Sequence, residues 1–181
     1  MFSKPLIKRL WWVLPIVALL ILIPVLSSQY VHLLLVDDVR HERLVFAERI
    51  TPGDLLSIGF LHSVEHCYIW DRLQVDEGYG LVVVATEFAE SRTGLPYAAF
   101  EGEVFERLEN GFRISNMRRP VPEIYQWVDT KYDNKMTINN HHAISLTSLA
   151  GNTLLHIRTD KLTLLEWLLL EAKLSKLFRR S

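Results

Sequence analysis

The chain has 181 residues, 49% of them hydrophobic, which is enough for one ordinary domain with a hydrophobic core and an additional segment. Its 20 lysines and arginines against 21 acidic residues give a formal net charge of −1. Nucleic-acid-binding proteins usually have an excess of basic residues that cluster on the surface, so we expect no nucleic-acid partner. Cys67 is the single cysteine, so no intrachain disulfide forms and burial must hold the domain together.

The N-terminal sequence predicts a membrane anchor. Residues 10–26, LWWVLPIVALLILIPVL, form a charge-free apolar run that continues through SSQYVHLLLV to Asp37. About 20 apolar residues are needed to cross a bilayer. Lys4, Lys8 and Arg9 precede the run, which predicts an N-terminus in the cytoplasm. We therefore expect a single-pass anchor in the cell membrane over residues 1–36, with the rest of the chain in the periplasm; a cleaved signal peptide is the alternative.

From about residue 41 the sequence changes to short runs with a period near two, rich in β-branched and aromatic residues. Gly, Pro and Asn turns separate them, for example Asn110-Gly111. This pattern predicts a mainly β domain over residues 37–160, an antiparallel β-sandwich or barrel-like fold. The predicted strands are 43–50, 54–62, 67–75, 81–88, 103–108, 111–115, 142–148 and 153–159. We expect 116–141 to be a long loop with at most one edge strand, around Ile124–Val128.

The C-terminal segment, residues 161–181, has the apolar spacing of an amphipathic helix. Asp160 or Thr163 is its expected N-cap, and Glu166, three residues after Thr163, completes a capping box. Charges spread along the segment make a second membrane span unfavourable. Two interpretations stay open: the helix packs on the sheet, or it lies at the bilayer surface beside the anchor.

Residues 60–67, FLHSVEHC, gather histidines, a serine and the cysteine. On an extended strand His62 and Ser63 point to opposite faces, so a nucleophile–base pair is disfavoured. His62 and His66 would be about 13 Å apart on a strand, too far to share one metal ion unless a turn intervenes. We therefore predict no enzyme activity, no cofactor and no metal site, with His62 and Cys67 in structural roles.

A ligand site is the alternative interpretation of the same region. If the chain turns after His62, Glu65 comes within reach as a further ligand. Asp71 and Glu87, on the next two predicted strands, are the other carboxylates that such a site would use. The alternative function is thus a metal- or small-ligand-binding module built on His62, Glu65 and Asp71.

Three segments carry a family resemblance: HSVE at 62–65, IWDRLQV at 69–75 and EFAESRTGLPY at 87–97. They resemble the uncharacterised bacterial and archaeal family named domain of unknown function 1850. That family shows a His-Ser-Val element, a carboxylate about nine positions further on, here Asp71, and a strand that leads into a Ser-x-Gly-Ala-Gly-Leu-Pro loop. The resemblance covers roughly residues 44–160, and Arg92 and Thr93 replace the Gly-Ala of the loop.

The resemblance implies a role in transport and no catalytic activity. Such proteins often accompany tripartite ATP-independent periplasmic (TRAP) transporters that use a TAXI-type solute-binding protein. We therefore expect a membrane-anchored extracytoplasmic accessory or binding protein, with the lipid bilayer and a transporter or solute-binding protein as partners.

The segment ESRTGLPY is the first candidate contact surface. Gly94 and Pro96 restrict the backbone so that Arg92 and Tyr97 are presented in defined directions, and arginine and tyrosine are frequent at interface hot spots. In the alternative interpretation Leu95 closes the end of the sandwich. The predicted contact residues are Ser91, Arg92, Gly94, Leu95, Pro96 and Tyr97, together with His62, Glu65 and Asp71. A second candidate surface is MRRPVPEIYQW, residues 117–127.

Overall fold

The computed structural model describes residues 4–61, 67–89, 99–100, 102–139, 141 and 143–178. The chain divides into two compact units: residues 32–160, and residues 1–31 with 161–181. The helices are α1 (Lys4–Ser28), α2 (Leu146–Ala150) and α3 (Leu164–Phe178). The strands are β1 (Tyr30–Asp38), β2 (Arg43–Arg49), β3 (Leu55–Leu61), β4 (Tyr68–Val75), β5 (Leu81–Phe88), β6 (Val104–Leu108), β7 (Gly111–Ser115), β8 (Arg119–Val121), β9 (Glu123–Val128), β10 (Lys135–Ile138), β11 (Ile144–Ser145) and β12 (Thr153–Thr163).

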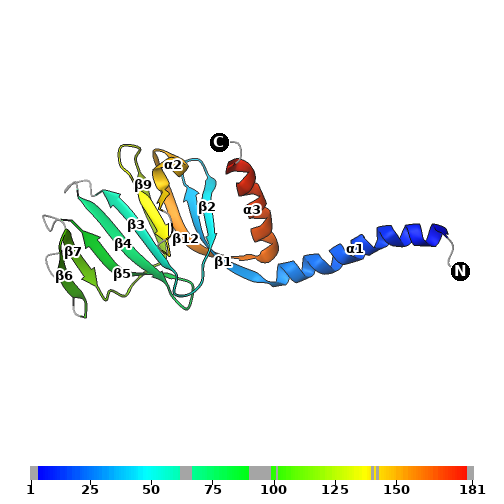
Figure 1. The fold of residues 1–181 in the computed structure, drawn as a ribbon, viewed down its shortest axis with the longest axis horizontal. Coiled ribbons are helices and arrows are strands. Elements are labelled where there is room, and N and C mark those ends of the chain that lie inside the picture. Colours follow the sequence, from blue (N-terminus) through cyan, green and yellow to red (C-terminus); the bar gives the residue numbers. More distant parts are fainter. Residues whose placement is uncertain are drawn as a thin grey trace. The chain divides into compact units, whose positions relative to one another are not determined.

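The strands form two antiparallel sheets (Figure 1). One has four strands in the order β2-β1-β12-β9, and the other has eight, in the order β11-β10-β3-β4-β5-β7-β6 with β8 beside β5. The main hydrophobic cluster takes buried side chains from both sheets, among them Leu34, Val36, Ile58, Leu73 and Leu155. The mainly β, antiparallel fold is confirmed, and two sheets that share one core are consistent with a β-sandwich.

Most of the predicted strands are present, and the differences fall where pairing partners are distant in sequence. The segment 142–148 is not one strand: β11 has only two residues before α2 begins, because Ser145 caps that helix by accepting a hydrogen bond from the Ser148 N–H. The segment 116–141 is not one long loop, since it holds β8, β9 and β10. β9 is the edge strand expected at Ile124–Val128, extended by one residue.

β1 is a strand that the sequence analysis did not predict. Its residues were included in the apolar run of the expected anchor, whereas α1 ends at Ser28. Leu33, Leu34, Leu35 and Val36 are all buried, so both faces of the strand are covered and no alternating pattern marks it.

The C-terminal helix is confirmed, with Thr163 as its cap. The Glu166 N–H donates to the Thr163 hydroxyl oxygen at 3.2 Å, and the Glu166 carboxylate accepts from the Thr163 N–H at 2.8 Å, which is the predicted capping box. β12 continues to Thr163, four residues beyond the predicted strand end. Within the part of the chain that the structure describes, no helix combines the length and the apolar content of a membrane span.

The turn between β1 and β2 is fixed by a fully buried carboxylate, Asp38. The Thr153 hydroxyl donates to its Oδ1 at 2.6 Å, and Arg43 Nε donates to its Oδ2 at 3.2 Å. His41 Nδ1 lies 2.7 Å from the same Oδ2. Burial raises the pKa of Asp38, but the three hydrogen bonds outweigh burial and bring the pKa to about 2. Asp38 therefore ties the β1–β2 turn to β12 as an ion.

Replacing this carboxylate predicts a loss of stability that depends on pH. A pKa lowered from 3.8 to about 2 corresponds to on the order of 2 kcal/mol, present above the unfolded value and lost as the pH falls through the folded value. We expect Asp38→Asn to lower the melting temperature of the full chain in mild detergent by several degrees at pH 7. The variant and the parent should converge near pH 2.

Asp133→Asn is the matched control, because Asp133 forms an exposed ion pair with Lys135. It should change the stability by no more than about 0.5 kcal/mol. Equal effects of the two substitutions at pH 7 would contradict the role assigned to Asp38.

Candidate functional site

Two of the motif segments leave the eight-stranded sheet at the same end. Leu61, the residue before the segment 62–66, pairs with Tyr68 of β4. Phe88, at the end of β5 and just before the segment 90–98, pairs with Ile69, the neighbour of Tyr68. Of the predicted contact residues, Asp71 is described, and the others lie outside the described residues: His62, Glu65, Ser91, Arg92, Gly94, Leu95, Pro96 and Tyr97. The fold therefore brings the flanks of both motifs together.

Asp71 lies on the core-facing side of this end of the sheet. It pairs across the strands with Ile58 and Thr86, and the Thr86 hydroxyl donates to its Oδ1 at 2.6 Å. Burial raises the pKa of the Asp71 carboxyl, and the hydrogen bond from Thr86 opposes that rise only in part. Asp71 is thus a partly buried carboxyl group that is costly to ionise. By strand alternation this is also the face predicted for His62.

A second hydrophobic cluster lies next to Asp71 on the same face. It consists of the buried residues Cys67, Ile69, Phe88, Ile114 and Met117. Ile69 belongs to this cluster and Leu73 to the main one, so Asp71, between them on β4, marks the boundary of the two. The prediction that Cys67 acts as a small buried hydrophobe is confirmed.

Glu87 lies on the opposite face from Asp71 and is held by two arginines. Arg113 donates to Oε1 through Nη2 at 2.7 Å and through Nε at 3.0 Å, and Arg72 Nη2 donates to Oε2 at 3.1 Å. Burial raises the pKa of Glu87, but the two guanidinium groups outweigh it and the pKa is lowered. Because Thr86 faces Asp71, its neighbour Glu87 cannot. The two carboxylates therefore cannot serve one ligand.

Trp70 covers the outer face beside this ion triad. A Cβ built on Gly59 would lie 2.7 Å from the indole ring, so the ring rests on the backbone of β3. The Arg72 guanidinium carbon is 5.6 Å from the ring centroid, in cation–π contact. Arg72 also donates to the Ser57 hydroxyl at 2.7 Å. Gly59 inside a predicted strand was the sequence signal for this close approach.

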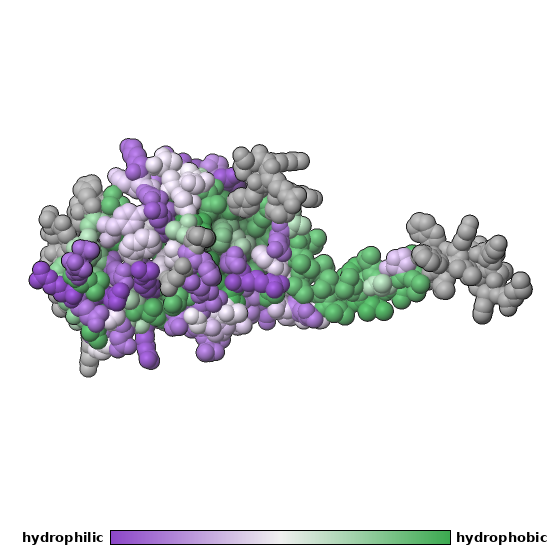
Figure 2. Space-filling view, viewed as in Figure 1, coloured by the Kyte–Doolittle hydropathy of each residue, from purple (hydrophilic) through white to green (hydrophobic). Residues whose placement is uncertain are grey.

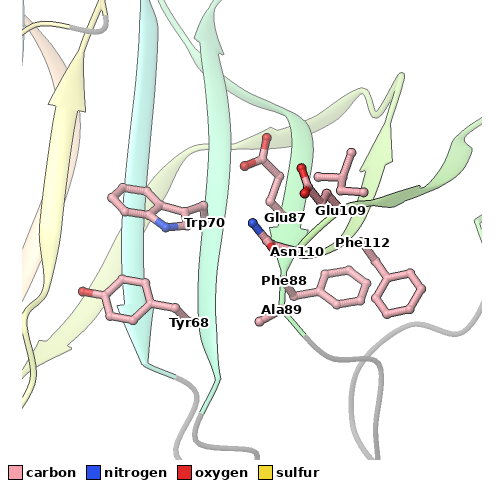
Figure 3. A pocket seen from close by; sticks show the side chains of 9 residues that line it. Tyr68, Trp70, Glu87, Phe88, Ala89, Glu109, Asn110 and Phe112 are labelled. Atoms are coloured by element: carbon pink, nitrogen blue, oxygen red, sulfur yellow. The ribbon is translucent and has the colours of Figure 1, made fainter.

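A pocket of about 420 Å³ opens at the motif end of the sheet (Figure 3). Tyr68 and Trp70 lie on one side of it, and Glu87, Glu109 and Asn110 lie on the other, with Phe88 and Phe112 below. The size falls in the range of small-molecule sites. The Tyr68 hydroxyl is buried and has no hydrogen-bond partner among the described residues. Burial and the nearby Asp133 carboxylate raise its pKa.

The second candidate surface is formed partly by strands. Tyr125 and Trp127 of β9 are 56% and 52% exposed, on the same face because they are two residues apart. Tyr125 stacks on His156 with ring centroids 4.5 Å apart, and the Arg40 guanidinium lies 5.7 Å from the centroid of Trp127. Arg119, in contrast, is held by Glu103 at 2.6 Å. Tyr125 and Trp127 are therefore the exposed aromatic side chains of this surface, and Arg40 lies beside Trp127.

Histidine, cysteine and carboxylate side chains do not gather in threes at metal-binding distance anywhere in the described ranges. The residues that sequence reasoning missed are Thr86, Arg72, Arg113 and Trp70. Their contacts depend on which strands pair, and the sequence pattern of a single strand does not reveal its pairing partner.

The raised pKa of Asp71 predicts an unusual response to pH. A carboxyl whose folded pKa lies above its unfolded value of about 3.8 contributes stability that is present at low pH and is lost as the pH rises through the folded pKa. We expect Asp71→Asn to gain stability relative to the parent as the pH rises from about 4 to 7, because the amide oxygen of the introduced side chain still accepts from Thr86. Melting temperatures of the full chain across this range measure the effect.

Thr86→Val is the control for this interpretation. It removes the hydroxyl that lowers the pKa of Asp71, so the pH dependence should become steeper. A constant offset between Asp71→Asn and the parent at every pH would show that Asp71 is not strained when ionised.

Comparisons with known proteins return one match. Residues 56–144 match the model of a family described as Domain of unknown function (DUF1850). Neither the curated proteins nor the solved structures contain a match. The matched region begins in β3 and ends at the first residue of β11, so it includes the eight-stranded sheet's motif end, Asp71 and Glu87. The match confirms the family resemblance over residues 56–144, which lie within the range 44–160 that the sequence motifs indicated.

Proposed function

We propose that the protein is a membrane-anchored extracytoplasmic accessory protein that binds a component of a TAXI-type TRAP transporter. The observation that carries the anchoring is the surface of α1. Its side chains from Leu14 to Val25 are apolar and exposed, for example Leu14 at 60%, Leu20 at 68% and Val25 at 46% (Figure 2). A helix with apolar residues exposed on all sides is typical of a lipid-embedded segment.

The length and flanks of α1 support the same role. No helix qualifies as a span among the described residues, but the charge-free part of α1 in the sequence, residues 10–28, is about 28 Å long at 1.5 Å per residue, close to the roughly 30 Å of a hydrocarbon core. The charge-free run 10–26 lies wholly within α1. Lys4, Lys8 and Arg9 precede that run, which favours a cytoplasmic N-terminus and an extracytoplasmic β domain.

The binding role is supported by exposed residues of the types that dominate protein interfaces. Tyr125, Trp127 and Arg40 form such a group on one face of the four-stranded sheet. The transporter as partner comes from the family resemblance, and the segment 91–97 remains the other predicted contact.

The anchor is tested by a charge placed in the middle of α1. Leu20→Arg should lower retention in alkali-washed membranes, because arginine at a helix centre costs about 3 kcal/mol on insertion scales. Leu20→Ile is the matched control and should stay in the membrane fraction. A parent chain that alkali releases completely, with its N-terminus intact by mass spectrometry, would contradict the anchor. Removal of the N-terminus at a defined site would establish the signal-peptide alternative.

Partner binding is tested by co-purification from membranes in mild detergent. We expect the transporter's membrane subunits or its solute-binding protein to co-purify with the tagged full chain. Trp127→Ala should reduce that capture at least fivefold, about 1 kcal/mol, at an unchanged melting temperature. Tyr132→Ala, another exposed aromatic at 40%, is the control. Capture that neither Trp127→Ala nor Arg92→Ala weakens would contradict both predicted contact surfaces.

A second candidate function is the binding of a small ligand or cation next to Asp71. The observation that favours it is a carboxyl with a raised pKa at the sheet end from which both motif segments depart. A bound ligand stabilises the folded state by mass action. We expect divalent cations, tested singly, to raise the melting temperature of the parent and leave Asp71→Asn unchanged. Identical responses of both proteins would reject this candidate.

A further inference from the structure

The start of α3 is fixed to the end of α1 within the unit formed by residues 1–31 and 161–181. The Leu164 N–H donates to the Gln29 carbonyl oxygen at 2.8 Å, one residue after α1 ends. The Lys161 ammonium lies 4.3 Å from the ring centroid of Tyr30. The two helices also contact each other. The first residue of α3 therefore lies next to the residue that follows α1.

α3 has two apolar stripes. Trp167, Leu170 and Leu174 have the spacing of one helix face, and Trp167 is only 7% exposed. Leu165, Leu168 and Leu169, at i, i+3 and i+4, form the other stripe on the opposite side of the helix. Leu168 is 43% exposed and Leu169 65% exposed. A helix that only packs on protein needs one apolar stripe, whereas the second stripe, with Leu165 half-buried, leaves Leu168 and Leu169 exposed among the described residues.

Charge along α3 separates the two stripes and favours anionic surroundings at its C-terminal end. Glu166, Glu171 and Lys173 are exposed and lie off the Leu165–Leu169 stripe. The sequence then continues with Lys176, Arg179 and Arg180 and has no acidic residue after Glu171. An amphipathic segment with basic residues in its sequence is typical of helices that lie in the headgroup region of anionic membranes.

We propose that α3 lies in the membrane interface, in the leaflet where α1 leaves the bilayer. Leu168 and Leu169, with the half-buried Leu165, face the acyl chains. The proposal rests on the proposed membrane anchor, because that anchor brings the bilayer to Gln29. α3 is then a second attachment, about 22 Å long at 1.5 Å per residue, that covers its own exposed stripe with lipid.

The experiment places a nitroxide on each side of α3 in the full chain, reconstituted into vesicles of phosphatidylcholine and phosphatidylglycerol. Leu169→Cys reports on the exposed stripe. Glu171→Cys is the matched control, since it is exposed two residues away on another side of the helix. Cys67 is buried, and the unsubstituted chain gives the labelling blank. The readout is the ratio of collisions with oxygen, which concentrates in lipid, to collisions with a water-soluble nickel complex.

We expect this ratio to be several-fold higher at position 169 than at position 171. Equal, water-like ratios in a chain that sediments with the vesicles would overturn the inference while the α1 anchor stands. A label at 169 that is shielded from both reagents and shows dipolar broadening would overturn it in favour of a second copy of the chain. A chain that does not sediment with the vesicles would overturn the anchor and this inference with it.

Discussion

The pairing of β1 with β12 is the constraint on which the rest of the architecture depends. The two strands come from opposite ends of the chain and are neighbours in the four-stranded sheet. They run antiparallel, since the Val39 N–H donates to the Leu154 carbonyl at one end and the Leu164 N–H to the Gln29 carbonyl at the other. This ladder fixes Thr153 beneath the buried Asp38 and starts α3 beside the end of α1. This one pair of strands therefore joins residues near the two ends of the described chain.

The parts of the fold that were predictable are those in which each element has its own local signal. In β2 to β7, apolar and polar residues alternate or the strand ends at a turn with Gly, Pro or Asn. These two signals predict the ends of the strands to within about one residue. The start of α3 likewise has a local signal, the capping box of Thr163 and Glu166. β1 has no such signal, because Leu33–Val36 are buried on both faces and the run reads as a continuation of the apolar helix. β8 and β10 are short and acquire their pairing from strands far away in sequence.

The candidate site was predictable to the extent that strand alternation decides it. Alternation along one strand predicts that His62 shares the face of Ile58, and only the pairing of Ile58 with Asp71 places Asp71 on that face. The separation of Asp71 from Glu87 required the register of β4 against β5, which no single strand contains. The pairing of Glu87 with Arg113 links residues 26 positions apart, and the ring of Trp70 lies on Gly59 of another strand. The sequence therefore identified Asp71 and Glu87 as candidate site residues, and the pairing of the strands showed that they lie on opposite faces of the sheet.

The position of β12 in the sheet also has a consequence for the order of synthesis. Of the described strands, β12 leaves the ribosome last, yet it lies between β1 and β9. Until it arrives, β1 has a partner only on the β2 side, and an apolar strand with an open edge is prone to pair with other chains. Closure of the four-stranded sheet must wait for a contact that spans most of the chain, which is the kind of contact that slows folding.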